Sequence, residues 1–159
     1  MRQSIEKVAL LYAKSIYCAA YNICKNAEDA NDVVQEVLVS YHLHSNKQFD
    51  NEEHLRAWLL RVGINKAKDL VCSPWHRLRV GFEGSEEEIP FEEPGEHLLY
   101  QEVMELPEKY RIVMHLYYYE DLTIREIAEI LGKSESGIKM RLSRGREFLK
   151  NILKEEMEG

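Results

Sequence analysis

The stretch that decides the fold is residues 123–146, which read TIREIAEILGKSESGIKMRLSRGR. Its start, Thr123 to Glu126, is a capping-box sequence and predicts the first turn of a helix. Gly132 predicts the left-handed cap that ends this helix, and Ser134 can cap the next one. Two helices joined by such a short turn, the second of them basic, are typical of a helix-turn-helix.

The second of these helices has one apolar side and a polar, basic remainder. At about 100° per residue, Ile138, Leu142 and Leu149 fall together, and Arg144 is expected to point directly away from them. Short polar side chains and Arg144 would face base edges in a major groove, while flanking cations reach phosphates. A solvated amphipathic helix is the alternative. The predicted DNA-contacting residues are Ser136, Lys139, Met140, Arg141, Ser143, Arg144 and Arg146.

Upstream, Leu106-Pro107 predicts a helix that continues to about Tyr118, with the proline in its first turn. Before it lies an acidic stretch: residues 80–108 contain ten Asp or Glu and no Lys or Arg, in a chain of net charge −7. Glycines and prolines between residues 81 and 95 favour a flexible, extended linker. We therefore predict an all-α protein with two small helical domains, residues 1–76 and 96–159, joined by an acidic flexible linker, residues 77–95.

In the first domain, Asn26 followed by two acidic residues predicts a helix start. This helix has a buried apolar stripe, and its opposite face carries Asp32, Gln35, Glu36 and Val39. A loop at residues 46–53 contains Phe49. The next helix, about 54–71, has two apolar stripes and ends before Ser73-Pro74. The narrow polar strip left between the stripes holds Arg61, Asn65 and Lys68.

Composition excludes several classes of protein. Hydrophobic residues are 45% of the 159 residues, which is enough for a core. No apolar run reaches the roughly 18–20 residues that span a bilayer, and the start MRQSIE is too polar for a secretion signal. The three cysteines, without a CxxC pair, suggest free thiols in a reducing cytoplasm. We expect a soluble, cytoplasmic protein.

The sequence carries no clear metal-binding or enzyme signature. His42-x-His44 and Cys72-x-x-x-His76 lie in different segments and give no four-ligand zinc spacing. Nucleophile-elbow, P-loop and dinucleotide glycine patterns do not occur. We therefore expect no metal, cofactor or small-molecule substrate, and no enzymatic activity.

Taken together, these motifs resemble the extracytoplasmic-function sigma factors of bacterial RNA polymerase. Residues 106–111 (LPEKYR), 131–134 (LGKS) and 139–146 (KMRLSRGR) are similar to the C-terminal domain of that family. Residues 32–36 (DVVQE) match its D-x-x-Q-E motif, and residues 57–65 (AWLLRVGIN) match W-L-x-R-I-A-x-N. A stand-alone helix-turn-helix regulator has no need of the D-x-x-Q-E helix. That regulator and a pure protein-interaction module are the alternatives.

The resemblance implies a factor that binds core RNA polymerase and promoter DNA, serves a stress or envelope-response regulon, and is held by a cognate anti-sigma factor. Asp32, Gln35, Glu36 and Val39 would then bind polymerase, and the C-terminal helix-turn-helix would read the −35 element. An ordinary solvated acidic face is the alternative for the first set. The implied −10 contacts, including a flipped base at Phe49 and Asn65, are Phe49, Arg61, Asn65, Lys68, His76, Arg77 and Arg79.

For Phe49 the alternative is a ring folded back on the core, and for Asn65 an ordinary surface amide. The acidic linker would follow the path of nascent RNA or serve only as a tether. Departures from the family pattern are Met140, where a serine is usual, and Gly145, which costs roughly 1 kcal/mol in a helix interior. Since Tyr12 already matches the later part of the family's first helix, a short or missing opening helix is expected.

Overall fold

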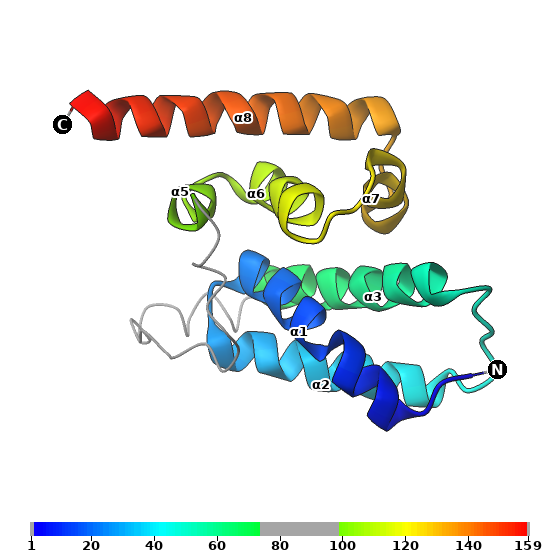
Figure 1. The fold of residues 1–159 in the computed structure, drawn as a ribbon. Coiled ribbons are helices and arrows are strands. Elements are labelled where there is room, and N and C mark those ends of the chain that lie inside the picture. The colour runs from blue at the N-terminus through cyan, green and yellow to red at the C-terminus, as the bar shows by residue number, and fades with distance from the viewer. Residues whose placement is uncertain (1, 74–98, 159) are drawn as a thin grey trace. The chain divides into compact units, whose positions relative to one another are not determined.

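The computed structural model describes residues 2–73 and 99–158, and within these ranges it contains helices and no strand (Figure 1). The predicted all-α class is therefore confirmed. The chain divides into two compact units, whose described parts are residues 2–73 and residues 99–158. The predicted linker, with His76, Arg77 and Arg79, lies outside the described residues, so the domain limits given above stay predictions.

The first unit consists of α1 (Ile5–Cys24), α2 (Ala27–Leu43) and α3 (Glu52–Cys72). Each helix begins after a side-chain cap: Ser4, Asn26 and Asn51 accept backbone N–H groups at 3.2, 2.9 and 2.8 Å. Asn51 explains why α3 starts slightly earlier than predicted. The expectation of a short or missing opening helix is wrong, because α1 is a regular helix of 20 residues.

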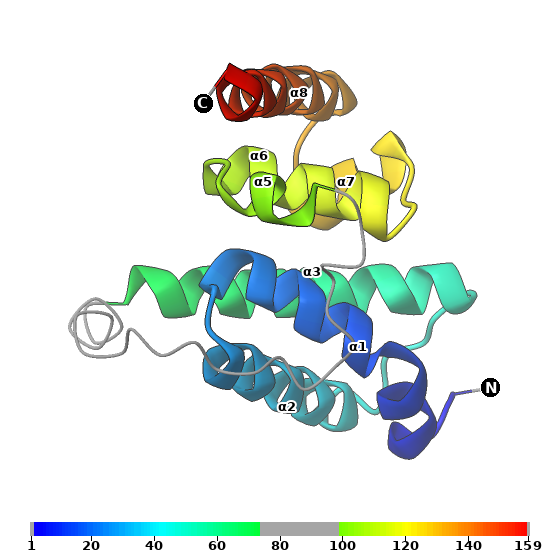
Figure 2. The ribbon, with the colours of Figure 1, turned by 60° about the vertical axis from the view of Figure 1, so that its left-hand side comes forward.

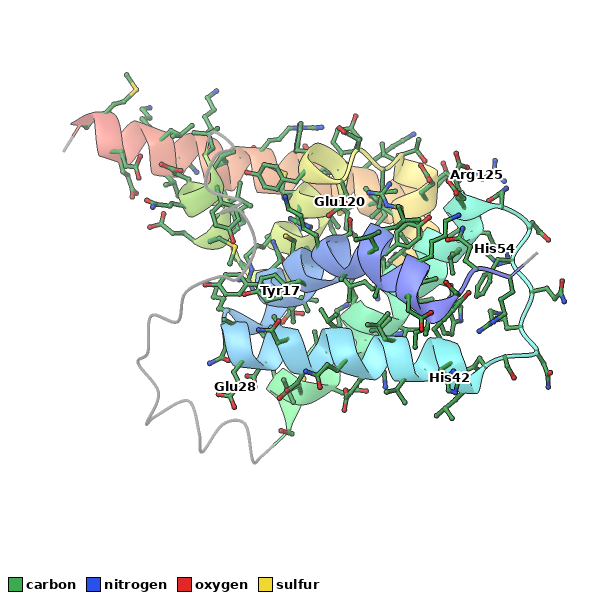
Figure 3. All side chains as sticks on the ribbon, turned by 60° about the horizontal axis from the view of Figure 1, so that its bottom comes forward. Tyr17, Glu28, His42, His54, Glu120 and Arg125 are labelled. Carbon is green, nitrogen blue, oxygen red and sulfur yellow. The ribbon has the colours of Figure 1, made fainter. Side chains whose placement is uncertain are left out.

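All three helices of the first unit pack against one another, as the two ribbon views agree (Figures 1 and 2). Tyr17 and Ile16 of α1 are fully buried, together with Leu59, Leu60 and Ile64 from the two apolar stripes of α3. Figure 3 shows Tyr17 on α1 within this bundle. The apolar stripe of α2 is buried as well, except for Leu38, which is half-buried; its buried members are Ala30, Val33, Val34, Val37 and Tyr41. This packing determines which faces of α2 and α3 remain outward.

The second unit contains α5 (Tyr100–Met104), α6 (Glu108–Met114), the π-helical turn η2 (His115–Tyr119), α7 (Ile124–Leu131) and α8 (Glu135–Glu158). Pro107 is the N-cap of α6 and not part of its first turn, which corrects the prediction by one position. The predicted helix to about Tyr118 is α-helical only to Met114 and continues as the π turn.

The predicted helix-turn-helix is α7 and α8. Thr123 and Glu126 form both hydrogen bonds of the capping box, at 2.9 and 3.1 Å. Gly132 ends α7 in the left-handed conformation with φ 66°, and the Ser134 hydroxyl accepts the Gly137 N–H at 3.0 Å. Figure 2 shows α8 lying along the layer formed by α5, α6 and α7.

Gly145 lies where α8 approaches α6. A Cβ at this position would be 3.1 Å from Met114 Cγ and 3.2 Å from Met114 Sδ, and Met114 is buried. The glycine that is unfavourable for a helix interior therefore permits close packing of α8 on α6. Ile138 and Leu142 are buried on the same side, as predicted, and Leu149 is half-buried.

Candidate nucleic-acid and partner interfaces

The outward face of α2 carries all four residues that the sequence analysis assigned to it. Asp32, Gln35 and Glu36 are exposed, and Val39 exposes 55% of its surface. Their exposure follows from the packing of α2 on α1 and α3, which buries the opposite stripe. A face of carboxylates with an exposed valine suits a basic partner that also covers apolar surface.

Leu43 extends this face and was missed by the sequence analysis. It lies four residues after Val39, on the same side of α2, and exposes 72% of its surface. The i, i+4 spacing from Val39 was the available signal. The outward face thus carries its carboxylates, Asp32 and Glu36, before its exposed apolar residues, Val39 and Leu43.

The polar strip of α3 is outward as predicted. Arg61 and Asn65 are exposed and Lys68 is half-buried, and the three recur at the i, i+4, i+7 spacing of one helix side. The cations Arg61 and Lys68 therefore lie on either side of the Asn65 amide, which has both hydrogen-bond donors and an acceptor. This arrangement can hold phosphates on either side of a hydrogen-bonded base.

Phe49 lies in an aromatic cluster with Tyr41, His54 and Trp58. Its ring centroid is 6.2 Å from that of Tyr41, 5.4 Å from His54 and 5.6 Å from Trp58, and the side chain is half-buried. Figure 3 shows His42 and His54 at the end of the unit where this loop connects α2 to α3. Phe49 thus packs on one side against its own unit and keeps part of its surface exposed, so both interpretations of its role stay open.

On α8, the predicted DNA-contacting residues are outward. Ser136, Lys139, Met140, Ser143, Arg144 and Arg146 are exposed, and Arg141 is half-buried. Met140 exposes 55% of its surface, so this helix presents an apolar side chain among polar ones. Such a surface can contact thymine methyl groups as well as base edges and phosphates.

Two arginines of α8 make contacts with neighbouring helices that a helical wheel does not predict. Arg144 lies near α6, because its hydrogen bond to Tyr110, together with nearby Lys109, lowers the pKa of Tyr110. Arg146 Nε donates to the Tyr118 hydroxyl at 2.7 Å. The wheel missed both contacts because long side chains reach sideways to neighbouring helices, here α6 and η2.

The described residues contain no group of three or more His, Cys, Asp or Glu side chains that could hold a metal ion. Cys18, Cys24 and Cys72 are not joined in a disulfide; Cys24 is buried and Cys72 is exposed. None of the described helices has the length and apolar character to cross a membrane.

Comparison with family models gives two matches. The model described as Sigma-70 region 2 matches residues 10–75, and that described as Sigma-70, region 4 matches residues 96–149. The first covers α2 and α3 with their outward faces, and the second covers the described helix-turn-helix.

Curated relatives agree with the family models. The chain is 30% identical to the RNA polymerase sigma factor SigV of Bacillus subtilis (strain 168), a match that covers 91% of this chain and 88% of SigV. It is 27% identical to the ECF RNA polymerase sigma factor SigW of the same organism, with 91% and 86% covered.

Two solved structures have a similar fold. One is the sigma factor RpoE in complex with the anti-sigma factor NepR from Bartonella quintana, with a TM-score of 0.71, 22% identity, and coverage of 94% of this chain and 96% of that chain. The other is CnrH in complex with the cytosolic domain of CnrY, with a TM-score of 0.67, 24% identity, and coverage of 94% and 87%.

Proposed function

The chain belongs to the extracytoplasmic-function sigma factors of bacterial RNA polymerase, and from that premise we propose which of its faces bind polymerase and promoter DNA. As a sigma factor it binds core RNA polymerase and directs it to promoters, where it initiates transcription without being an enzyme. A stand-alone helix-turn-helix regulator is not favoured, because the region 2 match accounts for residues 10–75, outside the helix-turn-helix.

Core polymerase is bound, in this proposal, by the outward face of α2: Asp32, Gln35, Glu36 and Val39. The support is their common exposure on a helix whose other side is buried. Exposed carboxylates would attract a basic surface, and burial of Val39 would add apolar contact area to the complex.

The −10 element is read from α3 and the loop before it. Asn65 can hydrogen-bond a base edge, and Arg61 and Lys68 on either side of it can neutralise phosphates. Phe49 would contribute the exposed part of its ring to a base that has left the stack. His76, Arg77 and Arg79 belong to the same proposed surface, and they lie outside the described residues.

The −35 element is read from α8, inserted in the major groove. Ser136, Met140 and Ser143 would face base edges together with Arg144, while Lys139, Arg141 and Arg146 would approach phosphates. The observation that carries this proposal is the capped α7, its Gly132 turn and the exposed basic side of α8.

We further propose that an anti-sigma factor holds this chain in the cytoplasm until a signal, of a stress or envelope type, releases it. The support is that two proteins of similar fold, RpoE and CnrH, are seen in complex with NepR and with the cytosolic domain of CnrY. An anti-sigma factor would bind the outward face of α2 that polymerase also requires. Val39 and Leu43 on this face are exposed and would be covered in either complex.

Run-off transcription tests the function directly. Core RNA polymerase is incubated with genomic DNA fragments, with and without this protein, and transcript start sites are mapped by sequencing. We expect discrete new starts that share two upstream sequence elements at fixed spacing. Absence of new starts, with a known sigma factor active in a parallel reaction, would contradict the proposal.

A further inference from the structure

Arg2 connects three parts of the first unit. Its guanidinium donates to the backbone carbonyl oxygen of Lys47 at 2.7 Å and to the carbonyl oxygen of Tyr41. It also lies over the Tyr41 ring, with Cζ 4.1 Å from the ring centroid. One side chain at the start of the described chain is therefore bound both to the end of α2 and to the loop that follows α2.

The neighbouring residue strengthens this connection. The Tyr41 hydroxyl donates to the backbone carbonyl oxygen of Gln3 at 2.6 Å. Tyr41 thus makes three contacts with the start of the chain. Its carbonyl oxygen accepts from Arg2, its ring lies under the Arg2 guanidinium, and its hydroxyl donates to Gln3. Tyr41 is buried, which places this exchange at the edge of the core.

The carbonyl groups that Arg2 binds need a partner from outside α2. Because α2 ends at Leu43, the carbonyl of Tyr41 is among its last four, which lack the usual intrahelical donor. The Lys47 carbonyl lies in the loop between α2 and α3, outside any helix. A charged donor with a fixed two-pronged geometry supplies both bonds at once.

Phe49 lies next to this arrangement. Its ring stacks on Tyr41, and Arg2 Cζ is 6.0 Å from its centroid. Arg2, Tyr41, Lys47, Phe49 and Leu55 are among the residues that line a cavity of about 170 Å³. The position of Phe49 therefore depends on a loop whose backbone is tied at Lys47 by Arg2.

We propose that Arg2 is a positioning residue for promoter opening: it holds the Phe49 loop, residues 44–51, in the conformation that presents Phe49 to the −10 element. This inference rests on the proposed role of Phe49. Arg2 acts through the loop backbone, and its own guanidinium is engaged by protein carbonyls.

The test compares Arg2→Ala, Arg2→Lys, Phe49→Ala and the double variant Arg2→Ala with Phe49→Ala, each as full-length protein in holoenzyme. Promoter opening is measured by permanganate reactivity, and binding to core polymerase is measured separately. Lys7→Ala, an exposed residue of α1, is the control for the loss of one positive charge. Thermal unfolding of each free variant fixes a working temperature at which all are folded.

We expect Arg2→Ala to slow opening about tenfold or more, as for loss of a hydrogen bond made by a charged group, with core binding unchanged. Arg2→Lys should resemble Arg2→Ala, because an ammonium cannot reproduce the two-pronged contact. The double variant should be no slower than Phe49→Ala. Lys7→Ala should open promoters normally.

Full opening by Arg2→Lys would assign the effect to positive charge near DNA and would overturn the inference. The inference would also be overturned if the double variant opened promoters more slowly than Phe49→Ala, or if Arg2→Ala lost binding to core polymerase. Normal opening by Arg2→Ala with slow opening by Phe49→Ala would overturn the role of Arg2 and leave the proposed −10 contact intact. Normal opening by both would overturn the role of the loop itself as well.

Discussion

Arg146 of α8 and Tyr118 of η2 are joined by a hydrogen bond of 2.7 Å from Nε to the phenolic oxygen. The Arg146 Cζ also lies 5.9 Å from the Tyr117 ring centroid and 5.7 Å from that of Tyr118. This hydrogen bond uses Nε, and the two Nη groups carry the further N–H donors of the guanidinium. A guanidinium already held by Tyr118 loses less rotamer entropy on binding a phosphate than an unrestrained one.

The pair predicts that Tyr118 supports a DNA contact without making one. Arg146→Ala should weaken binding of holoenzyme to all promoter sequences equally and reduce the salt dependence by about one unit of slope. Tyr118→Phe keeps the ring and removes the acceptor, so we expect a smaller uniform loss of about 0.5–1.5 kcal/mol. Fluorescence titrations at several salt concentrations measure both. A Tyr118→Phe effect that persists in the Arg146→Ala background would assign Tyr118 a separate role.

The second prediction concerns the polymerase face of α2. Asp32→Arg with Glu36→Arg should weaken core-polymerase binding at least tenfold, about 1.4 kcal/mol, because it reverses two exposed charges. Helicity and thermal stability should stay nearly unaltered, since neither side chain is buried. The matched control is Glu155→Arg with Glu158→Arg, the same charge change at the exposed end of α8. Unchanged core binding by the folded α2 variant would remove this face from the interface.

The third prediction concerns Asn65. Its replacement by alanine removes an exposed donor and acceptor and leaves both buried stripes of α3 intact. We expect weaker promoter opening with normal core binding, measured by permanganate footprinting on promoters carrying each base at the −10 positions. Opening that remains normal on every base variant would count against the assignment.

The fourth prediction separates base reading from phosphate binding on α8. Arg144→Ala should cost about 1–3 kcal/mol on the cognate −35 element and relax discrimination at one base position. Lys139→Ala should weaken all sequences about equally. Since Arg144 is hydrogen-bonded to Tyr110, Tyr110→Phe is the control that removes this contact and keeps the guanidinium. If Arg144→Ala weakened every sequence equally, Ser136, Lys139 and Ser143 would become the specificity candidates.

The same contact predicts a change in tyrosine titration. The hydrogen bond from Arg144 is the main cause of the lowered pKa of Tyr110, because it stabilises the phenolate. Arg144→Ala should therefore move the titration of Tyr110 to higher pH. Ultraviolet difference titration, with Tyr110→Phe identifying the signal, measures this shift, and an unchanged titration would exclude the contact in solution.

The last prediction concerns Gly145. Alanine gains roughly 1 kcal/mol of helix propensity, but a Cβ only 3.1 Å from buried Met114 overpacks the contact between α6 and α8. Overpacking typically costs about 1–3 kcal/mol, so we expect a net loss of stability in Gly145→Ala. Thermal denaturation measures it, and a raised midpoint would show that Met114 yields easily.

The sequence by itself determined α2, most of α3 and the helix-turn-helix, several of their caps, and the outward faces of these helices. The capping box at Thr123, the Gly132 cap and the Asn26 cap each depend on backbone groups within a few residues, so they can be read locally. The exposure of Asp32 and Glu36 follows from the 3.6-residue period of one helix. Resemblance added the roles of these faces, which the chain alone would not have supplied.

Only the tertiary structure decided how long side chains connect separate elements. Arg2 and Lys47 are 45 positions apart, and Arg146 and Tyr118 are 28 apart. The turn of Arg144 toward Tyr110 and the packing of Phe49 on Tyr41 and Trp58 likewise depend on how helices and loops meet. A helical wheel gives directions around one axis, whereas these contacts depend on the angles and distances between axes, which arise from burial of the whole core.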